Sequence, residues 1–514
     1  MSATSKPVQT ITIVGGGTAG WITAGILASA HDAASGRIKV RVIESPDIPT
    51  IGVGEGTWPT MRATLKAMGV RESDFLRACS ASFKQGSMFA GWVSGAADDV
   101  YYHPFELPLS FFETNPARAW LQGGSNTSFS KSVCPQEFIC EAHLAPKTAI
   151  TPDFAGVSNY GYHLDAGKFS AFIRTHCTNS LGVEHIPDTV VEILADPSGD
   201  IRAMKTQHYG EVDGDLFIDC TGFRSLLLGQ HCGIGLKPLQ DQLFIDTALA
   251  VQVPYEDGDP VRSQTVSTAQ AAGWIWDIGL SNRRGVGHVY SSRYTDEEQA
   301  REALRTYLGM SEAQLAEFSV RKLDITSGYR EKFWDRNCVA IGLSAGFVEP
   351  LEASAIVMIE MSAKMIAAQL PATRAAMDVV AKRFNRTFTH HWERIVDFLK
   401  LHYVLSQRSE PFWVDNRDPA TLSNRLREDL GLWEHQPPWT EDFDHKDEIF
   451  PAASYQYVLY GMGYRTAPDR NGLTQKEKRV DDERRAQIDR LLARGLSQLE
   501  TNRAVLDRVQ ASID

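Results

Sequence analysis

The chain has 514 residues, 43% of them hydrophobic and 23% charged, and these values exclude a disordered, collagen-like or coiled-coil protein. The 52 Lys and Arg residues against 64 Asp and Glu residues give a formal net charge of −12, so we do not expect nucleic acid as a partner. The chain shows no apolar run of about 18 residues and no signal-peptide core, so we expect a cytoplasmic protein without membrane contact. Its seven cysteines are scattered and contain no CxxC pair, so we expect no zinc site.

The N-terminal third opens with a strand–turn–helix–strand pattern. The pattern predicts a buried strand at 9–14, a glycine turn at 15–20, a helix at 21–30 and a strand at 38–43. A glycine-rich loop at 52–56 and a helix near 59–68 follow. Residues 158–176 read as a loop and then a helix.

The rest of the chain moves from strands to helices. Further strands are expected at 188–194, 201–208, 215–219, 245–252, 285–292 and 338–342. From residue 353 the pattern is helical, with a break at Pro371, a long helix at 373–406 and a charged amphipathic tail at 474–511.

The glycine turn matches a nucleotide-binding fingerprint. In GGGTAG at 15–20, Gly15 permits the tight turn, Gly17 lets the backbone approach a pyrophosphate, and Gly20 lets helix and strand pack closely. Glu44 follows the second strand and suits a ribose hydroxyl. The chain returns to small-residue turns after two later strands, at 215–224 and 338–346, which favours an extended FAD over NAD.

Two segments carry isolated charges in apolar surroundings. Lys84 is the one charged residue between positions 78 and 97, so it is either a desolvated amine or a lysine whose head reaches water. Glu352 and Glu349 are the only charges between 338 and 359. We expect Glu352 in the first turn of a helix, where backbone N–H groups of Ala353, Ser354 and Ala355 could also hold a small anion.

Two aromatic pairs are candidates for ligand contact. Trp274 and Trp276 alternate on a predicted strand, which places both indoles on one face; sheet core is the plain alternative. His103 and Phe105 lie two residues apart in an extended segment and could enclose a flat aromatic substrate, although the local pattern alone favours a satisfied loop histidine.

These motifs together resemble a known family. The sequence is similar to flavin-dependent halogenases of the tryptophan halogenase family from residue 9 to about 465, through GGGTAG at 15–20, GVGEGTWP at 52–59, SFKQG around Lys84, YGYHLDAGKF at 160–169, IDCTGFRS at 218–225, WIWDIG at 274–279 and FVEPLEASAI at 347–356. The order of the lysine, the tryptophan pair and the PLE glutamate is specific in combination.

The resemblance implies a role for each matching residue. Lys84 and Glu352 would be catalytic, Ser354 and Ala355 would bind halide, His103 and Phe105 would stack on the substrate, and Trp274 and Trp276 would shield the flavin. The residues expected to contact FAD are Gly15, Gly17, Thr18, Ala19, Gly20, Glu44, Gly54, Glu55, Thr221, Gly222, Gly342 and Ile356.

The resemblance also implies a fold and a reaction. We expect an α/β (α+β) Rossmann-type fold like that of flavoprotein monooxygenases, with a FAD-binding and halogenation module at 1–372 that holds an inserted substrate-side sheet. A mostly helical region at 373–514 would cover the substrate site. FADH2 from a separate flavin reductase, O2 and chloride or bromide would give hypohalous acid, which Lys84 directs to an electron-rich, indole-like ring. A homodimer is a further expectation.

Three departures from the family pattern limit the comparison. Gly279 replaces the signature proline, Ala353-Ser354-Ala355 replaces Ser-Thr-Gly, and the segment 454–464 does not clearly reproduce a grip for the amino-acid end of tryptophan. We therefore expect indole-like rings rather than free tryptophan. A flavin-dependent aromatic hydroxylase and a non-catalytic FAD-binding protein remain the alternatives.

Overall fold

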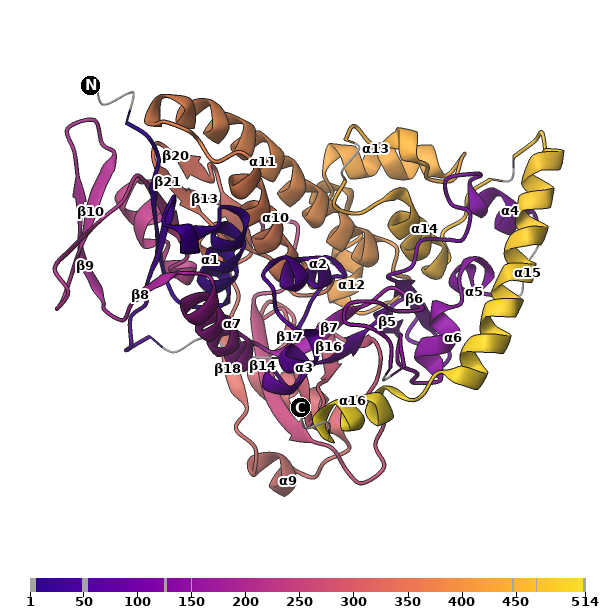
Figure 1. The fold of residues 1–514 in the computed structure, drawn as a ribbon. Helices are drawn as coiled ribbons and strands as arrows, with labels where there is room; N and C mark the ends of the chain where they lie inside the picture. The colour runs from indigo at the N-terminus through magenta and orange to yellow at the C-terminus, as the bar shows by residue number, and fades with distance from the viewer. Residues whose placement is uncertain are drawn as a thin grey trace. The chain divides into compact units, whose positions relative to one another are not determined.

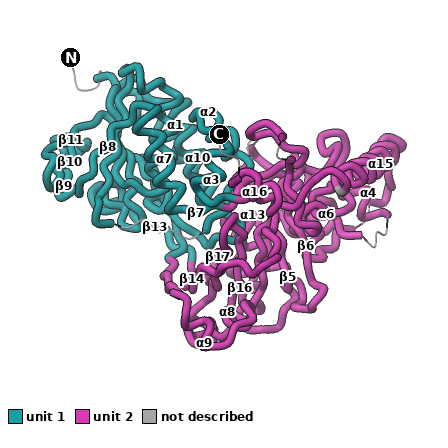
Figure 2. Tube along the Cα trace, turned by 60° about the horizontal axis from the view of Figure 1, so that its bottom comes forward, with its two compact units in different colours: residues 1–81, 164–239, 326–392 teal, residues 82–163, 240–325, 393–514 magenta. Residues whose placement is uncertain are grey.

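The computed structural model describes residues 6–48, 54–123, 127–148, 150–445, 448–467 and 469–511. They form two compact units, coloured separately in Figure 2. Unit 1 contains residues 1–81, 164–239 and 326–392, and unit 2 contains residues 82–163, 240–325 and 393–514. The chain crosses between the units repeatedly, so neither unit is a continuous segment.

Unit 1 is organised around a six-stranded sheet with the order β20-β21-β12-β1-β2-β8. Its strands are β1 (Thr10–Val14), β2 (Lys39–Ile43), β8 (Glu184–Ile186), β12 (Leu216–Asp219), β20 (Trp334–Asp335) and β21 (Cys338–Ala340). Neighbours run parallel except β20 and β21. The carboxyl ends of β1, β12 and β21 therefore meet at one edge, where ligands of such sheets bind.

Helix α1 (Thr18–Ala30) packs on this sheet, and the other helices of this group pack on α1 or on one another (Figure 1). These others are α2 (Thr60–Ala67), α3 (Glu72–Ala78), α7 (Ala166–Ser180) and α10 (Ser354–Ala368). α1 lies against α7 and α10, and its residues 20–28 are all buried, because this helix is apolar on every side rather than on one stripe. Short turns η2 (Ala33–Ser35), η3 (Gly222–Arg224), η4 (Leu226–His231) and η5 (Gly342–Ser344) complete the connections, with a small sheet of β13 (Leu236–Pro238), β19 (Gly328–Arg330) and β22 (Gly346–Phe347).

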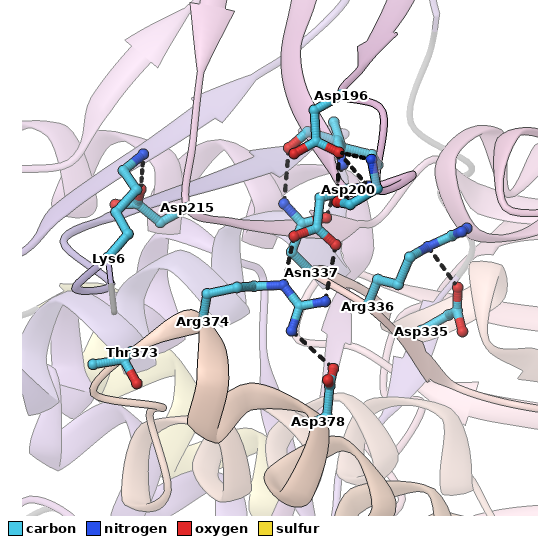
Figure 3. A network of polar contacts seen from close by, with 12 residues as sticks. Lys6, Asp196, Asp200, Asp215, Asp335, Arg336, Asn337, Thr373, Arg374 and Asp378 are labelled. Carbon is cyan, nitrogen blue, oxygen red and sulfur yellow. Dashed lines mark hydrogen bonds and ion pairs between the residues drawn. The ribbon is translucent and has the colours of Figure 1, made fainter. Parts of the chain in front are cut away.

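A polar network joins a second small sheet to the rest of unit 1 (Figure 3). This sheet contains β9 (Val190–Ala195), β10 (Ile201–Thr206) and β11 (Glu211–Asp213). Asp200, in its β9–β10 turn, binds the guanidinium of Arg374 at 2.5 and 2.9 Å, and Arg374 also contacts Asp378 at 2.8 Å. The Asn337 side chain exchanges two hydrogen bonds with the backbone of Ile201. The two-oxygen contact with arginine fixes the orientation of the turn.

Unit 2 is built on a seven-stranded sheet with the order β18-β14-β17-β16-β15-β5-β6. Its strands are β5 (Gly86–Ala90), β6 (Val100–Pro104), β14 (Thr247–Pro254), β15 (Thr265–Gln270), β16 (Gly273–Gly279), β17 (Arg283–Tyr290) and β18 (Arg321–Asp324). Only the β15–β5 pair is parallel. β16 is buried at every position, so it is the central covered strand of this sheet.

The remaining elements of unit 2 are mostly helical. They are α4 (Pro116–Gln122), α5 (Phe129–Val133), α6 (Gln136–Glu141), α8 (Glu297–Leu308), α9 (Glu312–Ala316), α12 (Pro411–Asp415), η6 (Pro419–Thr421), α13 (Asn424–Trp433), η7 (Thr440–Asp442), α14 (Ala452–Gly461), α15 (Gln475–Gln498) and α16 (Asn502–Ala511). Helix α14 packs against β6 and α5. The long helix α11 (Arg374–Val404) contributes residues to both units.

The fold class expected from the sequence is confirmed, since the structure is a mixed α/β protein with a helical C-terminal region. The expected helix at 373–406 is α11, and the tail forms α15 and α16. The division at residue 372 stays a prediction. None of the helices in the described part of the chain is long and apolar enough to cross a bilayer.

One expected loop is a strand. Residues 161–165, expected to be irregular, form β7 (Gly161–Asp165), which pairs antiparallel with β4 (Ser82–Lys84). The pairing joins segments about 80 residues apart, and a local pattern does not report such a partner. The glycine-rich loop at 52–56 is described only from residue 54, as β3 (Gly54–Gly56).

Candidate active site

The glycine turn of unit 1 has the geometry of a nucleotide cradle. Gly15 has φ of +112°, and a Cβ atom there would lie 2.2 Å from the carbonyl oxygen of Cys220. A Cβ atom at Gly20 would lie 1.8 Å from the carbonyl oxygen of Gly15. A Cβ atom at Gly17 would meet nothing within 4 Å, and Gly17 caps α1 without a side-chain hydrogen bond. The first turn of α1 thus presents backbone N–H groups toward open space, the arrangement that binds phosphate.

Glu44 lies beside this turn as an ionised carboxylate. Its Oε2 atom is 2.8 Å from His185 Nε2 and 3.4 Å from Arg174 Nη1. Burial alone would raise the pKa of Glu44, but the hydrogen bond from His185 and the charge of Arg174 outweigh it and leave the pKa below its usual value. A Cβ atom at Gly16 would lie 2.2 Å from the Glu44 side chain, so the glycine is what lets the carboxylate approach the turn.

A buried aspartate that the sequence analysis did not single out organises the neighbouring loops. Asp219 ends β12 and accepts hydrogen bonds from Thr221, from the backbone N–H groups of Leu227 and Leu228, and from Ser344. The Ser344 hydroxyl also reaches the Gly222 carbonyl at 3.1 Å. Asp219 therefore joins two of the turns expected to contact FAD.

The turn that holds Gly342 lies directly against α1. Gly342 has φ of +71°, and a Cβ atom there would lie 2.7 Å from Cβ of Ala19. Ile356, on α10, is 1% exposed. The edge of the sheet thus brings together the glycine turn, the Thr221–Gly222 turn and the Gly342 turn, which lie far apart in the sequence.

Glu352 precedes α10, and this corrects the expectation that it lies in the first helical turn. The helix begins at Ser354, because Pro350 to Ala353 form a turn in which the Ala353 N–H donates to the Pro350 carbonyl at 3.0 Å and Ala353 is left-handed, with φ of 52°. Glu352 is 4% exposed, and its carbonyl accepts a hydrogen bond from Trp58 Nε1 at 2.8 Å. No side chain caps the N-terminus of α10, so the backbone N–H groups around Ser354 and Ala355 do not donate to a capping side chain.

In unit 2, Lys84 is buried beside an aromatic ring. Its side chain, at the end of β4, is 1% exposed, and Nζ lies 5.2 Å from the centre of the Phe105 ring. The main chains are held together at this point: the Gln85 carbonyl accepts from the Phe105 N–H at 3.1 Å, and the Gln85 N–H donates to the Ser263 carbonyl at 2.6 Å. The structure therefore brings together two residues that the sequence analysis assigned to catalysis and substrate.

His163 lies close to Lys84, and its pKa depends on the charge of that lysine. The β4–β7 register places Ser82 opposite His163 and Lys84 opposite Gly161, so His163 and Lys84 are diagonal neighbours on one face. Burial lowers the pKa of His163 well below its usual value, and the charge of Lys84 lowers it further. His163 Nε2 bonds Thr265 Oγ1 at 2.8 Å, which ties this strand pair to β15.

One face of the seven-stranded sheet carries the tryptophan pair and His103. Trp276 on β16 pairs with Ser267 on β15. Thr265 precedes Ser267 by two residues on β15 and pairs with Ser87 on β5. Ser87 in turn pairs with His103 on β6. Side chains at such positions project to the same face. The tryptophan pair and His103 therefore share a face, with small hydroxyl side chains between them.

The individual aromatic side chains are firmly placed. The rings of Trp274 and Trp276 are 6.4 Å apart, and a Cβ atom at Gly287 would lie 2.1 Å from the Trp276 ring, so only glycine leaves room for that indole. His103 Nε2 bonds the Ser454 hydroxyl on α14 at 2.9 Å, a contact that the sequence did not reveal. At Gly279, in place of the signature proline, a Cβ atom would lie 2.8 Å from the Tyr255 hydroxyl oxygen, which fills that space.

Comparison with known proteins gives the family. The family description "Tryptophan halogenase" matches residues 10–477. This chain belongs to the tryptophan halogenase family. It is an enzyme of the flavin-dependent halogenase class, and the family uses FAD and a halide.

Relatives and solved structures agree along the whole chain. The tryptophan 6-halogenase ThaL of Streptomyces albogriseolus is 35% identical over 80% of this chain and 79% of its own length. A tryptophan halogenase from Shewanella frigidimarina is 46% identical, with a TM-score of 0.96 over 99% of both chains. BrvH, a flavin-dependent halogenase from Brevundimonas sp. BAL3, is 30% identical, with a TM-score of 0.83 over 98% of this chain and 99% of its own. The expected family, fold and enzyme class are confirmed, while the roles of individual residues stay predictions.

Proposed function

We propose that this halogenase takes FADH2 from a separate flavin reductase and transfers a chlorine or bromine atom, through Lys84, to an electron-rich, indole-like ring. The observation that carries the proposal is the burial of Lys84, 1% exposed, beside the Phe105 ring. A buried amine against an aromatic wall is a nucleophile placed where an aromatic substrate can stack.

The residues of unit 1 fit the cofactor. The cradle at Gly15, Gly17 and Gly20 would hold the pyrophosphate and Glu44 the ribose, because the first offers open N–H groups and the second is an ionised acceptor. The predicted flavin-side contacts are Thr18, Ala19, Gly54, Glu55, Thr221, Gly222, Gly342 and Ile356. When bound, reduced FAD supplies the electrons with which O2 converts the halide into hypohalous acid.

Lys84 captures the halogen before it reaches the ring. After the Lys84 ammonium has released a proton, the neutral amine forms a bond to the halogen as the oxygen–halogen bond of hypohalous acid breaks. One amine proton leaves with the hydroxide as water. Transfer to the substrate ring breaks the nitrogen–halogen bond and leaves its electron pair on the nitrogen. The ring then loses a proton, and one proton is returned to the nitrogen, which restores the amine. Hypohalous acid reacts with many groups, so selectivity depends on one donor held in one place relative to the ring.

Glu352 is the proposed acceptor of that ring proton. It is a buried carboxylate next to the N-terminus of α10, where Ser354 and Ala355 offer backbone N–H groups for halide. A positioned carboxylate is the usual acid–base group for such a transfer. This chain has Ser354 and Ala355 where the family has threonine and glycine. The backbone N–H groups at these two positions are not removed by the change.

The substrate ring is proposed to stack on His103 and Phe105. The Ser454 hydroxyl fixes the His103 imidazole, while α14 offers no charged side chain in its sequence AASYQYVLYG. A free amino acid carries an ammonium and a carboxylate that need charged or several polar partners. Indole-like molecules without that end therefore suit this surface better than free tryptophan.

The test is product mass in a complete reaction. The enzyme, a flavin reductase, NADH, FAD and bromide are incubated with indole, and products are analysed by mass spectrometry. A bromine isotope doublet on indole supports the proposal. Gain of one oxygen without bromine would show hydroxylation instead. Unchanged indole while NADH is consumed would contradict transfer to indole.

A further inference from the structure

A continuous series of aromatic rings runs from the tryptophan pair into the core of unit 2. The ring centres of Trp276 and Trp274 are 6.4 Å apart, and those of Trp274 and Trp92 are 6.2 Å apart. Trp92 lies 5.6 Å from Phe89, which stacks on Tyr101 at 4.6 Å with the planes only 7° apart. Each step lies within the separation of direct aromatic contact.

The series leads to Tyr101, which forms a hydrogen bond with the imidazole of His402. The Tyr101 hydroxyl lies 2.6 Å from Nδ1 of His402, and both side chains are buried. The His402 ring also stacks on Phe89 at 4.7 Å and lies 5.9 Å from Trp92. Tyrosine loses an electron easily only when its proton leaves at the same time, and imidazole is a base able to accept that proton.

Trp274 and Trp92 have no such base among the residues that the structure describes. Trp274 Nε1 is buried and has no acceptor among the described residues, and Trp92 Nε1 donates to a backbone carbonyl, that of Ser267, at 3.0 Å. An amide carbonyl is too weak a base to take the indole proton. A tryptophan oxidised here therefore stays a cation and can pass its charge on, whereas Tyr101 can form a neutral radical.

A side branch of the series is disfavoured by charge. Trp413 lies 5.2 Å from Trp92, but the guanidinium of Arg408 sits 5.4 Å from the centre of the Trp413 ring. A cation over the ring stabilises the neutral indole and opposes its oxidation. The electrostatics thus favour movement of positive charge from Trp92 toward Tyr101 over movement toward Trp413. Tyr403, 5.4 Å from Trp92, is a second neighbouring tyrosine.

We propose that Trp276, Trp274, Trp92 and Tyr101 form an electron-transfer path that carries one oxidising equivalent away from the flavin side of the site. This rests on the proposed function and on the expectation, implied by the family resemblance, that Trp274 and Trp276 shield the flavin. A one-electron oxidant, an oxygen-derived radical or photoexcited flavin, takes an electron from Trp276 or Trp274, and electrons then move from Trp92 and finally from Tyr101.

Charge and protons balance at the end of the path. Tyr101 loses one electron to the tryptophan cation and its phenolic proton to Nδ1 of His402, which gives a neutral tyrosyl radical and an imidazolium. A thiol or ascorbate from solution returns one electron, and the proton moves back to the phenol oxygen. The path would protect the site when oxygen reduction is not coupled to halogenation.

The test is laser flash photolysis of the full-length, FAD-loaded protein without oxygen. Blue light turns bound FAD into a one-electron oxidant, and tryptophan and tyrosyl radicals are followed by their transient absorption. In the unaltered protein we expect a tryptophan radical that decays as a tyrosyl radical grows. Tyr101→Phe should cut the tyrosyl yield at least tenfold and lengthen the life of the tryptophan radical, and Trp92→Phe should also lower the tyrosyl yield.

Tyr102→Phe is the matched control, because Tyr102 is the next residue of β6 and projects to the opposite face. It should leave both signals unchanged, and flavin affinity should match in all variants. A tyrosyl signal that survives in Tyr101→Phe overturns the path while the flavin placement stands. No tryptophan radical in the unaltered protein overturns the path together with the placement of the tryptophan pair beside the flavin.

Discussion

Lys84 Nζ lies 5.2 Å from the centre of the Phe105 ring, and the lysine side chain is 1% exposed. The relationship depends on two separate pairings: β4 with β7, which positions Lys84, and the hydrogen bond between the Gln85 carbonyl and the Phe105 N–H. A buried amine thus faces the ring that we expect to bind substrate. The proposed chemistry of the enzyme follows from that contact.

Gly17→Val should weaken flavin binding without unfolding the protein. A Cβ atom at Gly17 meets no protein atom within 4 Å, so the side chain occupies only the space proposed for the pyrophosphate. We expect FAD affinity to fall at least about tenfold, or about 1.4 kcal/mol. The control is Gly431→Val, at another open position in α13. Equal FAD affinity of the two variants in a fluorescence titration would show that the cradle is misassigned.

Glu352→Gln should lower turnover about 10²-fold or more, the usual effect of losing a positioned acid–base group. The backbone carbonyl that accepts the Trp58 hydrogen bond is unchanged by this substitution, so the melting temperature should stay close to that of the unaltered enzyme. Turnover is measured as halogenated indole formed per enzyme under excess reductase. Near-normal turnover in the variant would leave Glu352 without a catalytic role.

Indole should have a higher kcat/KM than free tryptophan. The surface around His103 is aromatic and hydroxylic, and α14 contributes no charge to hold an ammonium or a carboxylate. The two substrates are compared at equal reductase and halide concentrations, with products separated by chromatography. A clearly higher kcat/KM for tryptophan would reveal a grip for the amino-acid end elsewhere in the chain.

Glu55 should make the stability of the protein depend on pH. Burial raises the pKa of the Glu55 carboxyl to about 7 from a usual value of 4.5, so the folded protein binds a proton that the unfolded chain releases. The stabilising effect is complete below about pH 4.5 and is lost as the pH rises through 7. Glu55→Gln should therefore raise the melting temperature at pH 8 and change it little at pH 5. A variant that is equally stabilised at both pH values would contradict the raised pKa of the Glu55 carboxyl.

The sequence predicts the local geometry of the glycine turn. Gly15 and Gly20 are recognisable because each occupies a fixed place in a strand–turn–helix unit of contiguous residues. Asp219 was not identified, because its partner Ser344 is 125 residues away and no local pattern connects them. The start of α10 was placed too early, since Pro350 fits the first turn of a helix as well as the turn that the structure shows.

The site in unit 2 depends still more on long-range pairing. Trp276 and His103 share one sheet face because of the register of β16, β15, β5 and β6. Hydrophobic alternation along a single strand does not predict this register. The hydrogen bond from His103 to Ser454 joins residues 351 positions apart. Such contacts require the folded structure, whereas the identities of Lys84, Trp274 and Trp276 were available from the motifs.

The central claim, that Lys84 carries the halogen to the substrate, is tested most directly by Lys84→Met. Lys147→Met is the matched control, because Lys147 is also buried, at 5% exposed, and its Nζ lies 5.8 Å from the Tyr160 ring. Each variant is supplied with reductase, FAD, bromide and indole. Brominated indole and the bromination of a trap for free hypobromous acid are measured in the same reaction. We predict that Lys84→Met lowers brominated indole about 10²-fold or more while the trap is still brominated, and that Lys147→Met retains both activities. Brominated indole formed by Lys84→Met at a rate close to that of the unaltered enzyme would contradict the account.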